Sequence, residues 1–342
     1  MTYSGRIRSM RQLAQAALGA YGLSDARFRL VLDAGNALFR VFDPHPAAAG
    51  AASALFEEGQ YLLRLHQPNY RTADAIELEL AWLAAMRRDA DLPVPEPVPA
   101  LDGKLLTQAS IPGGAGERNC SLLRWVKGRS VKLRPQPHHL RSQGQLMARM
   151  HNASAKWQPP AGLTPRSYGW DGLFSDDAGS GMPNSEAWAL LPPSYLRPFT
   201  DVAEKVRQAM DEWGADPAVF GMIHADLGVD ANLLFWHGEP RAIDFDEAGL
   251  GYFLFDLAVA LEYCWGDAAF PRNRDALLDG YVELGSLPEK QLENLELFIA
   301  AVEVYWNLWA AGGIHLHPRY REPLSERIER TAGLVFRYLA GC

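Results

Sequence analysis

Hydrophobic and polar residues alternate along three short stretches in the first quarter of the chain. Arg27–Asp33 alternates up to an Ala-Gly-Asn turn at residues 34–36, residues 37–43 continue the alternation, and a third apolar run covers Gln60–Pro68. Alternation with a period of two is typical of half-buried β-strands, and glycine and asparagine favour tight turns. The pattern therefore predicts a β-hairpin followed by a third strand.

A helical pattern follows at residues 73–89. Thr72 precedes it as a cap, and Asp74 lies in its first turn, as helix N-termini prefer. Glu79 falls inside the apolar face, which consists of Ile76, Leu80, Leu83 and Met86. Because an acid on the packed side of a helix needs a positive partner, we expect Glu79 to form an ion pair.

The middle of the chain changes from strand patterns to helix patterns. A proline-rich stretch leads into a hairpin that we expect to turn at Asp102–Gly103, and the apolar stretch Cys120–Arg129 is a strand that ends at Gly128. Helical spacing then dominates, apart from a long glycine-rich loop at Gly162–Asn184. The predicted helices cover residues 140–157, Tyr195–Trp213, Phe253–Trp265, Pro271–Leu284, Glu289–Ala311 and Leu324–Leu339.

Composition narrows the classes of protein. The 342 residues are too many for one ordinary core, which favours two domains or one two-lobed fold. Hydrophobic residues make up 48% of the chain, which is typical of a globular protein. The net charge of −8 argues against nucleic acid as a partner. The scattered cysteines Cys120, Cys264 and Cys342 favour a reduced, cytoplasmic protein. No charge-free apolar run reaches membrane-spanning length, so we expect no membrane partner.

The first 23 residues allow two interpretations. Arg6, Arg8 and Arg11 precede an apolar stretch, and the first acid is Asp25. A signal or transit peptide has this general pattern. Two glutamines interrupt the apolar part, however, and a surface helix accounts for it equally well.

Residues 220–249 hold several polar side chains between apolar ones. These are His224, Asp226, Asp230, Asn232, Asp244, Asp246 and Glu247. Single polar groups in apolar strands are costly to bury without a partner. Two apolar runs flanking His-Gly-Glu-Pro also predict a hairpin. A turn centred on Gly238 would place Asn232 opposite Asp244, with Cβ atoms about 5 Å apart, where both can hold one hard cation such as Mg²⁺.

Asp226 and His224 lie on the loop that enters this hairpin. Asp226 would be near the cation without having to bind it, which suits a base that accepts a proton from a substrate hydroxyl group. Imidazole can hold a loop by hydrogen bonds, bind a metal or act in catalysis. For His224 we favour the structural role.

These motifs resemble the aminoglycoside phosphotransferase/choline kinase family, which consists of small-molecule kinases with a protein-kinase-like fold. They are His224-Ala-Asp226 followed by Asn232, and Ile243-Asp244-Phe245-Asp246. The resemblance covers most of the chain, because the segments at residues 61–68, 79–86, 92–98, 122–129, 146–151 and 255–261 follow the family's order. It implies a two-lobed α+β fold. An N-terminal antiparallel β-sheet lobe with one long helix would span 1–124, a hinge 125–129 and a mainly helical C-terminal lobe 130–342.

The resemblance also implies a role for each matching residue. Asp226 would be the catalytic base, and Asn232 and Asp244 would hold Mg²⁺. Asp246 would contact a second metal or brace the loop. The remaining positions concern the nucleotide, either ATP or GTP. They are Arg64 in place of a phosphate-binding lysine, its partner Glu79, Gly35 and Asn36 over the phosphates, and the hinge backbone of Leu123, Arg124, Trp125 and Val126 against adenine.

Three positions depart from the family pattern. Arg64 keeps the charge of the usual lysine and offers a planar fork to phosphate oxygens, unless it is a strand arginine that faces solvent. Six positions separate Asp226 from Asn232 where five are common, so that Asp230 either supplements or replaces Asn232 or is a solvated loop acid. Gly35 stands alone where the family has a glycine-rich loop, and an ordinary hairpin turn is the alternative.

We predict a phosphotransferase that moves the terminal phosphate of ATP or GTP to a hydroxyl group of a small molecule, as a monomer or homodimer. An acidic, aromatic cleft would suit an amine such as choline, an aminoglycoside, homoserine or a fructosamine-like compound. Ordinary surface acids and packed tryptophans are the simpler interpretation of its candidate residues. These are Asp176, Asp177, Glu247, Asp256, Glu262, Trp170, Trp188 and Trp265. A Ser/Thr protein kinase, a nucleotide-binding scaffold and a metallohydrolase built on His224, Asp226 and Asp244 are the alternatives.

Overall fold

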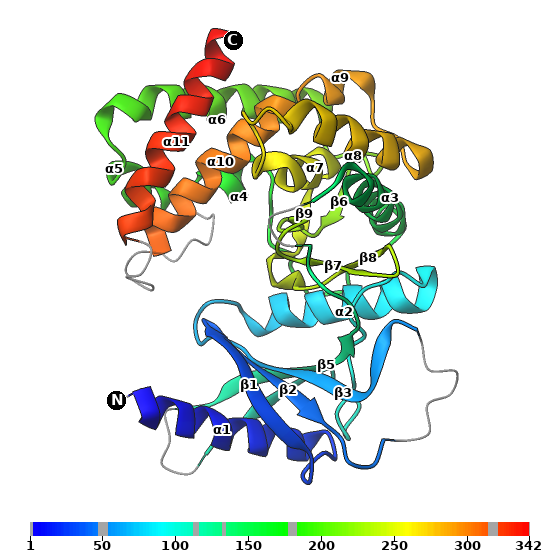
Figure 1. The fold of residues 1–342 in the computed structure, drawn as a ribbon. Helices are drawn as coiled ribbons and strands as arrows, with labels where there is room; N and C mark the ends of the chain where they lie inside the picture. Colours follow the sequence, from blue (N-terminus) through cyan, green and yellow to red (C-terminus); the bar gives the residue numbers. More distant parts are fainter. Residues whose placement is uncertain are drawn as a thin grey trace.

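The computed structural model describes residues 3–46, 54–111, 116–131, 135–176, 183–313 and 321–341. An N-terminal lobe built on a sheet lies against a larger, mainly helical C-terminal lobe, and helix α2 (Ala73–Ala90) lies at the junction between them (Figure 1). The predicted α+β fold class is therefore confirmed.

The N-terminal lobe is one antiparallel sheet with the strand order β1-β2-β3-β5-β4. The strands are β1 (Arg27–Ala34), β2 (Asn36–Phe42), β3 (Phe56–Leu65), β4 (Leu106–Ala109) and β5 (Arg118–Val126). Strands β1 and β2 form the predicted hairpin, because Gly35 adopts a φ of 96° that favours glycine at the tight turn. The predicted third strand is β3, which pairs with both β2 and β5.

The first helix, α1 (Tyr3–Ala20), packs on this sheet. Its buried residues Leu13, Ala17 and Leu18 form one core with Leu63 and Leu65 of β3. Successive strand residues point to opposite faces, so Leu62 and Arg64 of β3 point to the other side of the sheet, toward α2. The segment is thus helical, as one of its two interpretations expected.

The predicted turn at Asp102–Gly103 is present, since the Ala100 N–H donates to the Lys104 carbonyl oxygen at 2.8 Å. The segment before it is not a strand and forms only an isolated bridge between Pro97 and Leu123. Prolines lack the N–H group that a strand ladder requires, which explains this. The hairpin that reaches the sheet is instead β4–β5.

The C-terminal lobe begins after β5 and is mainly helical. Its longer helices are α3 (Pro137–Ser154), α6 (Pro193–Trp213), α7 (Phe253–Glu262), α8 (Phe270–Leu284), α10 (Leu295–Gly313) and α11 (Arg321–Ala340). Its short helical segments are α4 (Trp170–Phe174), α5 (Asn184–Ala189), α9 (Glu289–Leu292) and η1 (Phe245–Glu247). Its strands are β6 (Phe220–Ile223), β7 (Leu233–Trp236), β8 (Glu239–Ala242) and β9 (Gly249–Tyr252). None of the helices within the described ranges is long and apolar enough to cross a membrane.

The helix expected over Glu289–Ala311 is wrong in one respect, because α9 and α10 are separate helices. Asn294 lies between them, and its side-chain Nδ2 donates to the Lys290 carbonyl oxygen at 2.8 Å. Asparagine side chains compete with the helical backbone in this way. The Asn294 carbonyl oxygen then accepts the Phe298 N–H, so a new helix begins there.

The half-buried Glu262 at the end of α7 forms a carboxyl pair with the buried Glu303 of α10. Glu303 accepts hydrogen bonds from Thr331 Oγ1 at 2.9 Å and from Arg330 at 3.1 Å. Burial and the Glu303 carboxylate raise the pKa of Glu262 from 4.5 to about 7, although Arg327 and Arg330 oppose this. Folding therefore favours the neutral form of Glu262. The stability that this preference contributes is complete below a pH of about 4.5 and is lost as the pH rises through about 7.

Substituting Glu262 by glutamine tests this carboxyl pair. Glu262→Gln stays neutral at every pH, so we expect it to match the wild type near the ordinary pKa of the group. At about pH 8 it should be more stable than the wild type by on the order of 1–3 kcal/mol. Urea unfolding at both pH values measures the difference, with the exposed Glu289→Gln as control. A stability difference that does not change with pH would contradict the assignment.

Candidate active site

The hairpin β7–β8 carries the segment that the sequence singled out. Leu233 pairs with Ala242, and a two-residue turn joins the strands at His237 and Gly238, with φ values of 51° and 85°. The predicted register, with Asn232 opposite Asp244, is wrong by one residue. Asn232 lies opposite Ile243, whose N–H donates to the Asn232 carbonyl oxygen at 2.9 Å. A turn of two residues with positive φ at both matches the twist of a hairpin, so the centre falls between residues 237 and 238.

Asn232 fixes the side chain of Asp226. Its Nδ2 donates to both the carbonyl oxygen and the carboxylate Oδ2 of Asp226, each at 2.8 Å. Since the amide nitrogen is used in this way, the amide oxygen Oδ1 is the group that Asn232 can offer to a cation. Asp230, the alternative considered for the longer loop, is half-buried, and its carbonyl oxygen accepts from Ser130 Oγ at 3.1 Å.

Asp256 at the start of α7 holds the loop before Asp226. Its carboxylate accepts the backbone N–H groups of His224 at 3.0 Å and Ala225 at 2.6 Å, and it lies 3.1 Å from His151 Nε2. Burial raises the pKa of Asp256, but these hydrogen bonds and His151 lower it overall, so the carboxylate stays ionised. Asp256 is completely buried. It is therefore a positioning residue rather than part of an acceptor cleft.

His224 connects the same loop to the strand before Asp244. Its Nε2 lies 3.0 Å from the Ile243 carbonyl oxygen, and its ring packs on Phe245 with centroids 4.4 Å apart. Burial lowers the pKa of His224, which favours the neutral imidazole. These contacts agree with the structural role that we favoured from the sequence.

Arg64 of β3 joins the two lobes at the cleft. Its guanidinium donates to Glu79 of α2 at 2.9 and 3.2 Å and to Asp244 at 3.1 Å. Arg64 is 1% exposed, which rules out the alternative of a strand arginine facing solvent. Burial opposes its charge, but Glu79 and Asp244 raise the pKa of Arg64 overall. The ion pair that the position of Glu79 predicted is therefore present.

The tip of the β1–β2 hairpin contacts the segment after Asp244. Asn36 Nδ2 donates to Asp246 Oδ2 at 3.0 Å, while Asn36 Oδ1 accepts the Gln67 N–H at 2.9 Å. The hairpin that was expected to cover phosphates therefore reaches the predicted metal-binding segment of the other lobe.

Glu247 is the centre of a network that the sequence did not predict. Tyr70 donates to it at 2.7 Å and Tyr168 at 3.0 Å, and Arg71 and Arg166 form ion pairs with it. Burial raises the pKa of Glu247, but the two arginines lower it to about 2. No periodicity in the sequence pairs Glu247 with residues 79 or more positions away, and only its apolar surroundings indicated that it needs partners.

The segment expected to contact adenine lies at the end of β5. Leu123 and Val126 are buried, whereas Arg124 is exposed and its backbone N–H already donates to Glu96 at 2.9 Å. Trp125 packs against the Arg40 guanidinium at 4.2 Å. An apolar cluster connects this segment to the β7–β8 hairpin. It consists of Leu55, Phe56, Val126, Leu234 and Ile243.

Arg241 of β8 braces the same region from the C-terminal lobe. It is 2% exposed and donates to the carbonyl oxygens of Leu55 and Lys127, both at 3.1 Å. These two bonds connect the hairpin to the residue before β3 and to the chain that leaves β5, so Arg241 supports the crossing between the lobes.

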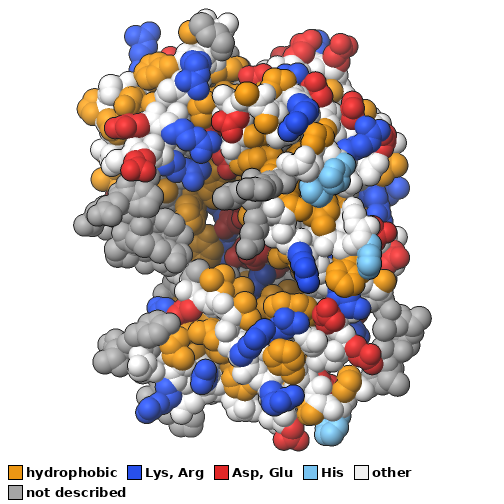
Figure 2. Space-filling view, viewed as in Figure 1, with side chains coloured by type: hydrophobic (Ala, Val, Ile, Leu, Met, Phe, Trp, Pro, Cys, Tyr) orange, Lys and Arg blue, Asp and Glu red, His pale blue; other side chains and the backbone are white. Residues whose placement is uncertain are grey.

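The acids at the floor of the cleft have strongly shifted pKa values. Acidic side chains are visible in the hollow between the lobes (Figure 2). Burial and then the carboxylates of Glu247, Asp246 and Asp244 raise the pKa of Asp226 well above its usual value. Burial and then Asp244 do the same to Asp246. Such shifts mark a site where additional positive charge would be strongly stabilised.

The residues proposed for an amine-binding cleft do not gather in one place. Trp170 and Trp188 line a shallow groove beside α6, and the Trp170 indole N–H donates to Ala203 at 2.8 Å. Trp265 is buried and packs on Tyr338 of α11. Asp176 accepts the Ser185 N–H at 2.7 Å, and Asp177 lies outside the described residues. The contacts of these tryptophans agree with the packing interpretation.

The fold and the site together define a two-lobed kinase of the protein-kinase-like class. Residues 46–290 match the model of the phosphotransferase enzyme family APH, and the chain belongs to this family. The resemblance stated from the motifs and the prediction of a small-molecule kinase are thereby confirmed.

Two homoserine kinases are similar in sequence. The one from Acidiphilium cryptum (strain JF-5) is 30% identical over 249 residues, which cover 70% of this chain and 69% of that protein. The one from Rhizobium meliloti (strain 1021) is 27% identical over 245 residues, covering 70% and 68%.

Two solved structures are similar over nearly the whole chain. A microcompartment-associated aminopropanol kinase has a TM-score of 0.79 and 27% identity, covering 96% of this chain and 97% of its own. The amicoumacin kinase hAmiN, solved with AMP-PNP, Ca²⁺ and Ami, has a TM-score of 0.74 at 17% identity, covering 97% and 96%. At that identity the second comparison supports the fold alone.

Removing Arg64 tests whether Glu79 depends on it. Arg64→Met leaves a buried carboxylate with no positive partner, so we expect a loss of about 3–5 kcal/mol in the free energy of unfolding. Arg64→Met combined with Glu79→Leu removes both charges and should recover most of that loss. Urea unfolding of both variants measures this.

Nucleotide binding by the same two variants shows whether Arg64 is also needed in the cleft. The double variant should fold but bind nucleotide poorly, because the charge that faces Asp244 is gone. An Arg64→Met protein as stable as the wild type would show that the ion pair is not needed at this junction.

Proposed function

We propose that this protein is a kinase that transfers the terminal phosphate of ATP or GTP to the hydroxyl group of a small amino alcohol. Asp226 is the base, and Mg²⁺ is the metal. The observation that carries the proposal is the fixed position of Asp226. Asn232 holds its carboxylate, and Asp256 holds the preceding backbone, so Asp226 keeps one orientation at the floor of the cleft.

The environment of Asp226 suits a base. Burial, and after it the neighbouring carboxylates, raise the pKa of Asp226, so the carboxylate can accept the proton of a hydroxyl group as that group attacks phosphorus. A base must lie within hydrogen-bond reach of the proton that it accepts. The half-buried Asp226 carboxylate meets this condition for a hydroxyl compound that enters between the lobes.

The residues around Asp226 fit a magnesium ion. Asp244 and Asp246 supply carboxylate oxygens, and Asn232 supplies its unused amide oxygen. Within the described part of the chain, no group of three or more His, Cys, Asp or Glu residues forms a complete metal site. Mg²⁺ usually takes one or two protein carboxylates and completes its coordination with phosphate oxygens. When bound, the ion would neutralise charge that develops on the transferred phosphate.

The opposite wall of the cleft would bind the rest of the nucleotide. Arg64, held in place by Glu79, presents its guanidinium beside Asp244, where phosphate oxygens can accept from it. We assign the purine to the apolar cluster between β5 and the β7–β8 hairpin, with the hinge at residues 125–129 joining lobes 1–124 and 130–342. Arg241 supports that assignment because it keeps the hinge backbone and β8 in one arrangement.

The acceptor class follows from charge and from the relatives. Asp226, Asp244 and Asp246 face a single arginine, Arg64, and this excess of negative charge favours a substrate that carries an amine. Homoserine and aminopropanol, named in the relatives' activities, both combine an amine with a hydroxyl group. We therefore expect a short amino alcohol or hydroxy amino acid, rather than a protein, to receive the phosphate.

A screen of amino alcohols, hydroxy amino acids and amino sugars for acceptor-stimulated release of ADP or GDP tests the proposal. At least one short amino alcohol should increase release above the rate with water alone. Nucleotide binding without turnover on any acceptor would instead favour a binding scaffold, and phosphate transfer to generic proteins alone would favour a protein kinase.

The role of Asp226 is tested by Asp226→Asn. The amide keeps the shape and can still accept from Asn232, but it cannot take a proton, so we expect kcat to fall by a factor of about 10² or more. Nucleotide affinity, measured by calorimetry, should change little. A fully active Asp226→Asn enzyme would remove Asp226 from the mechanism.

A further inference from the structure

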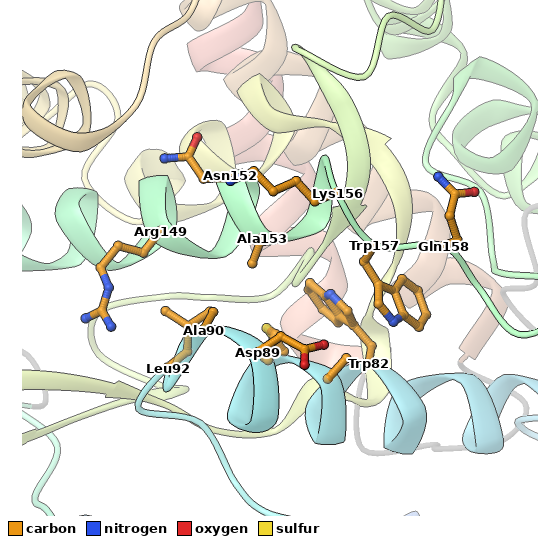
Figure 3. Close-up of a pocket in the computed structure, with 12 residues that line it drawn as sticks. Trp82, Asp89, Ala90, Leu92, Arg149, Asn152, Ala153, Lys156, Trp157 and Gln158 are labelled. Atoms are coloured by element: carbon orange, nitrogen blue, oxygen red, sulfur yellow. The ribbon is translucent and has the colours of Figure 1, made fainter.

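A second cavity lies away from the cleft floor, between α2 and α3. Its volume is about 430 Å³, within the range of roughly 300–1,000 Å³ that is usual for small-molecule sites. Figure 3 shows α2 below and α3 above, with Trp82 rising from α2 and Trp157 extending from the chain that follows α3. Neither the proposed reaction nor the family resemblance assigns a role to this cavity.

The walls of the cavity are apolar, but one polar group is unsatisfied. Met86, Ala90 and Leu92 contribute apolar surface together with the two indole rings. Trp82 is 1% exposed, and its Nε1 has no hydrogen-bond partner. A buried N–H without an acceptor costs about 1–3 kcal/mol. A ligand oxygen that accepts from Trp82 Nε1 would recover this energy.

The rim of the cavity is positively charged. Arg149 and Lys156 of the α3 region line it, and neither has a carboxylate partner within the described residues. Asp89 also lines the cavity, but Arg88 neutralises it through two hydrogen bonds of 2.7 Å. The charge that remains is cationic and favours an anion.

Trp82 connects this cavity to the catalytic segments. Its ring packs edge-on against Phe245, with centroids 5.6 Å apart, and Phe245 is the residue after Asp244. Phe245 in turn packs on His224, which lies on the loop that carries Asp226. Trp82 is also on the same helix as Glu79, the partner of Arg64. The position of one indole ring is therefore coupled to both the metal-binding segment and the phosphate-binding arginine.

We propose that the α2–α3 cavity binds a small amphipathic carboxylate, with an aromatic body between the two tryptophans and its anionic end near Trp82 Nε1 and Lys156 (Figure 3). The cavity is open in the arrangement that has the Arg64–Glu79 ion pair in place. A ligand that fits it stabilises that arrangement and therefore increases nucleotide affinity. The site would act as an activating regulatory site for the proposed kinase.

Binding is tested with naphthalene-2-carboxylate and ¹⁵N-labelled protein. The Trp82 indole N–H signal is identified by its loss in Trp82→Phe, which keeps an aromatic ring against Phe245 but removes the donor. We expect this signal to shift downfield and to saturate as the carboxylate is added, because the N–H gains an acceptor. A signal that does not move, or that moves without saturating, would overturn the site.

Matched controls measure the contribution of the positive charge at the rim separately from that of the Trp82 N–H donor. Lys156→Gln should weaken binding about five-fold or more, while Lys104→Gln, which changes a charge outside the cavity, should leave it unchanged. The neutral naphthalene-2-carboxamide should bind the wild type more weakly than the carboxylate. Equal binding of both ligands, or of both charge variants, would contradict an anion site.

Coupling is tested by nucleotide calorimetry without any acceptor, so the result does not depend on which substrate is phosphorylated. Saturating naphthalene-2-carboxylate should lower the Kd of AMP-PNP at least about five-fold, and AMP-PNP should tighten the carboxylate by the same factor. Trp82→Phe should reduce this coupling. An unchanged or weakened nucleotide affinity at saturation would reject the regulatory role. Loss of turnover on every acceptor, by contrast, would reject only the proposed reaction.

Discussion

The structure depends on the placement of buried carboxylates at the junction of the two lobes. A buried charge is tolerated only where a partner of opposite charge or several hydrogen bonds compensate for its lost hydration. Arg64 is the cation that satisfies this condition for two acids at once, Glu79 of the N-terminal lobe and Asp244 of the C-terminal lobe. This shared guanidinium therefore joins β3 and α2 to the segment that follows the β7–β8 hairpin, and Arg241 supports the same junction.

The other carboxylates of the site lie between residues 226 and 256 and divide into two groups. Asp256 and Glu247 are fully compensated, by backbone amides and by two arginines respectively, and their pKa values lie below the ordinary range. Asp226 and Asp246 are not, and burial and neighbouring acids raise their pKa values. The compensated acids hold the loops, and the uncompensated acids are the ones for which we propose a role with metal and substrate. Structural stability and catalytic potential are thus assigned to different residues of one short stretch.

Features that depend on the local pattern of residues were predicted correctly from the sequence. Features that depend on one particular backbone conformation or side-chain contact were not. The position of Glu79 in an apolar helix face correctly predicted an ion pair, since periodicity alone places it there. The register of β7–β8 was wrong because the backbone conformation of His237, not only that of Gly238, sets the turn. The break at Asn294 depends on one side-chain hydrogen bond, which composition does not reveal.

The candidate site shows the same division. Asp226, Asn232 and Asp244 could be chosen from their spacing, but the partners of Glu247 could not, because Arg71 and Arg166 lie on separate loops brought together only by the fold. Asp256 was a candidate acceptor-binding acid, with an ordinary surface acid as the simpler interpretation. It lies instead under the loop that carries Asp226, and the sequence does not show which face of a helix meets that loop. The family resemblance implied roles for the residues in the matching motifs. The residues that hold those motifs in place could be identified only from the tertiary contacts.

The most direct test of this account is the metal dependence of nucleotide binding, measured by calorimetry with AMP-PNP in the presence of Mg²⁺ or EDTA. If Asp244 and Asn232 hold the ion that bridges to phosphate, Mg²⁺ should tighten binding to the wild type about ten-fold or more, in keeping with the 10–100-fold effects of changes around metal ligands. Asp244→Asn should abolish this gain, and Asp230→Asn should keep it. An Asp244→Asn protein that retains the full gain, or an Asp230→Asn protein that loses it, would contradict the account.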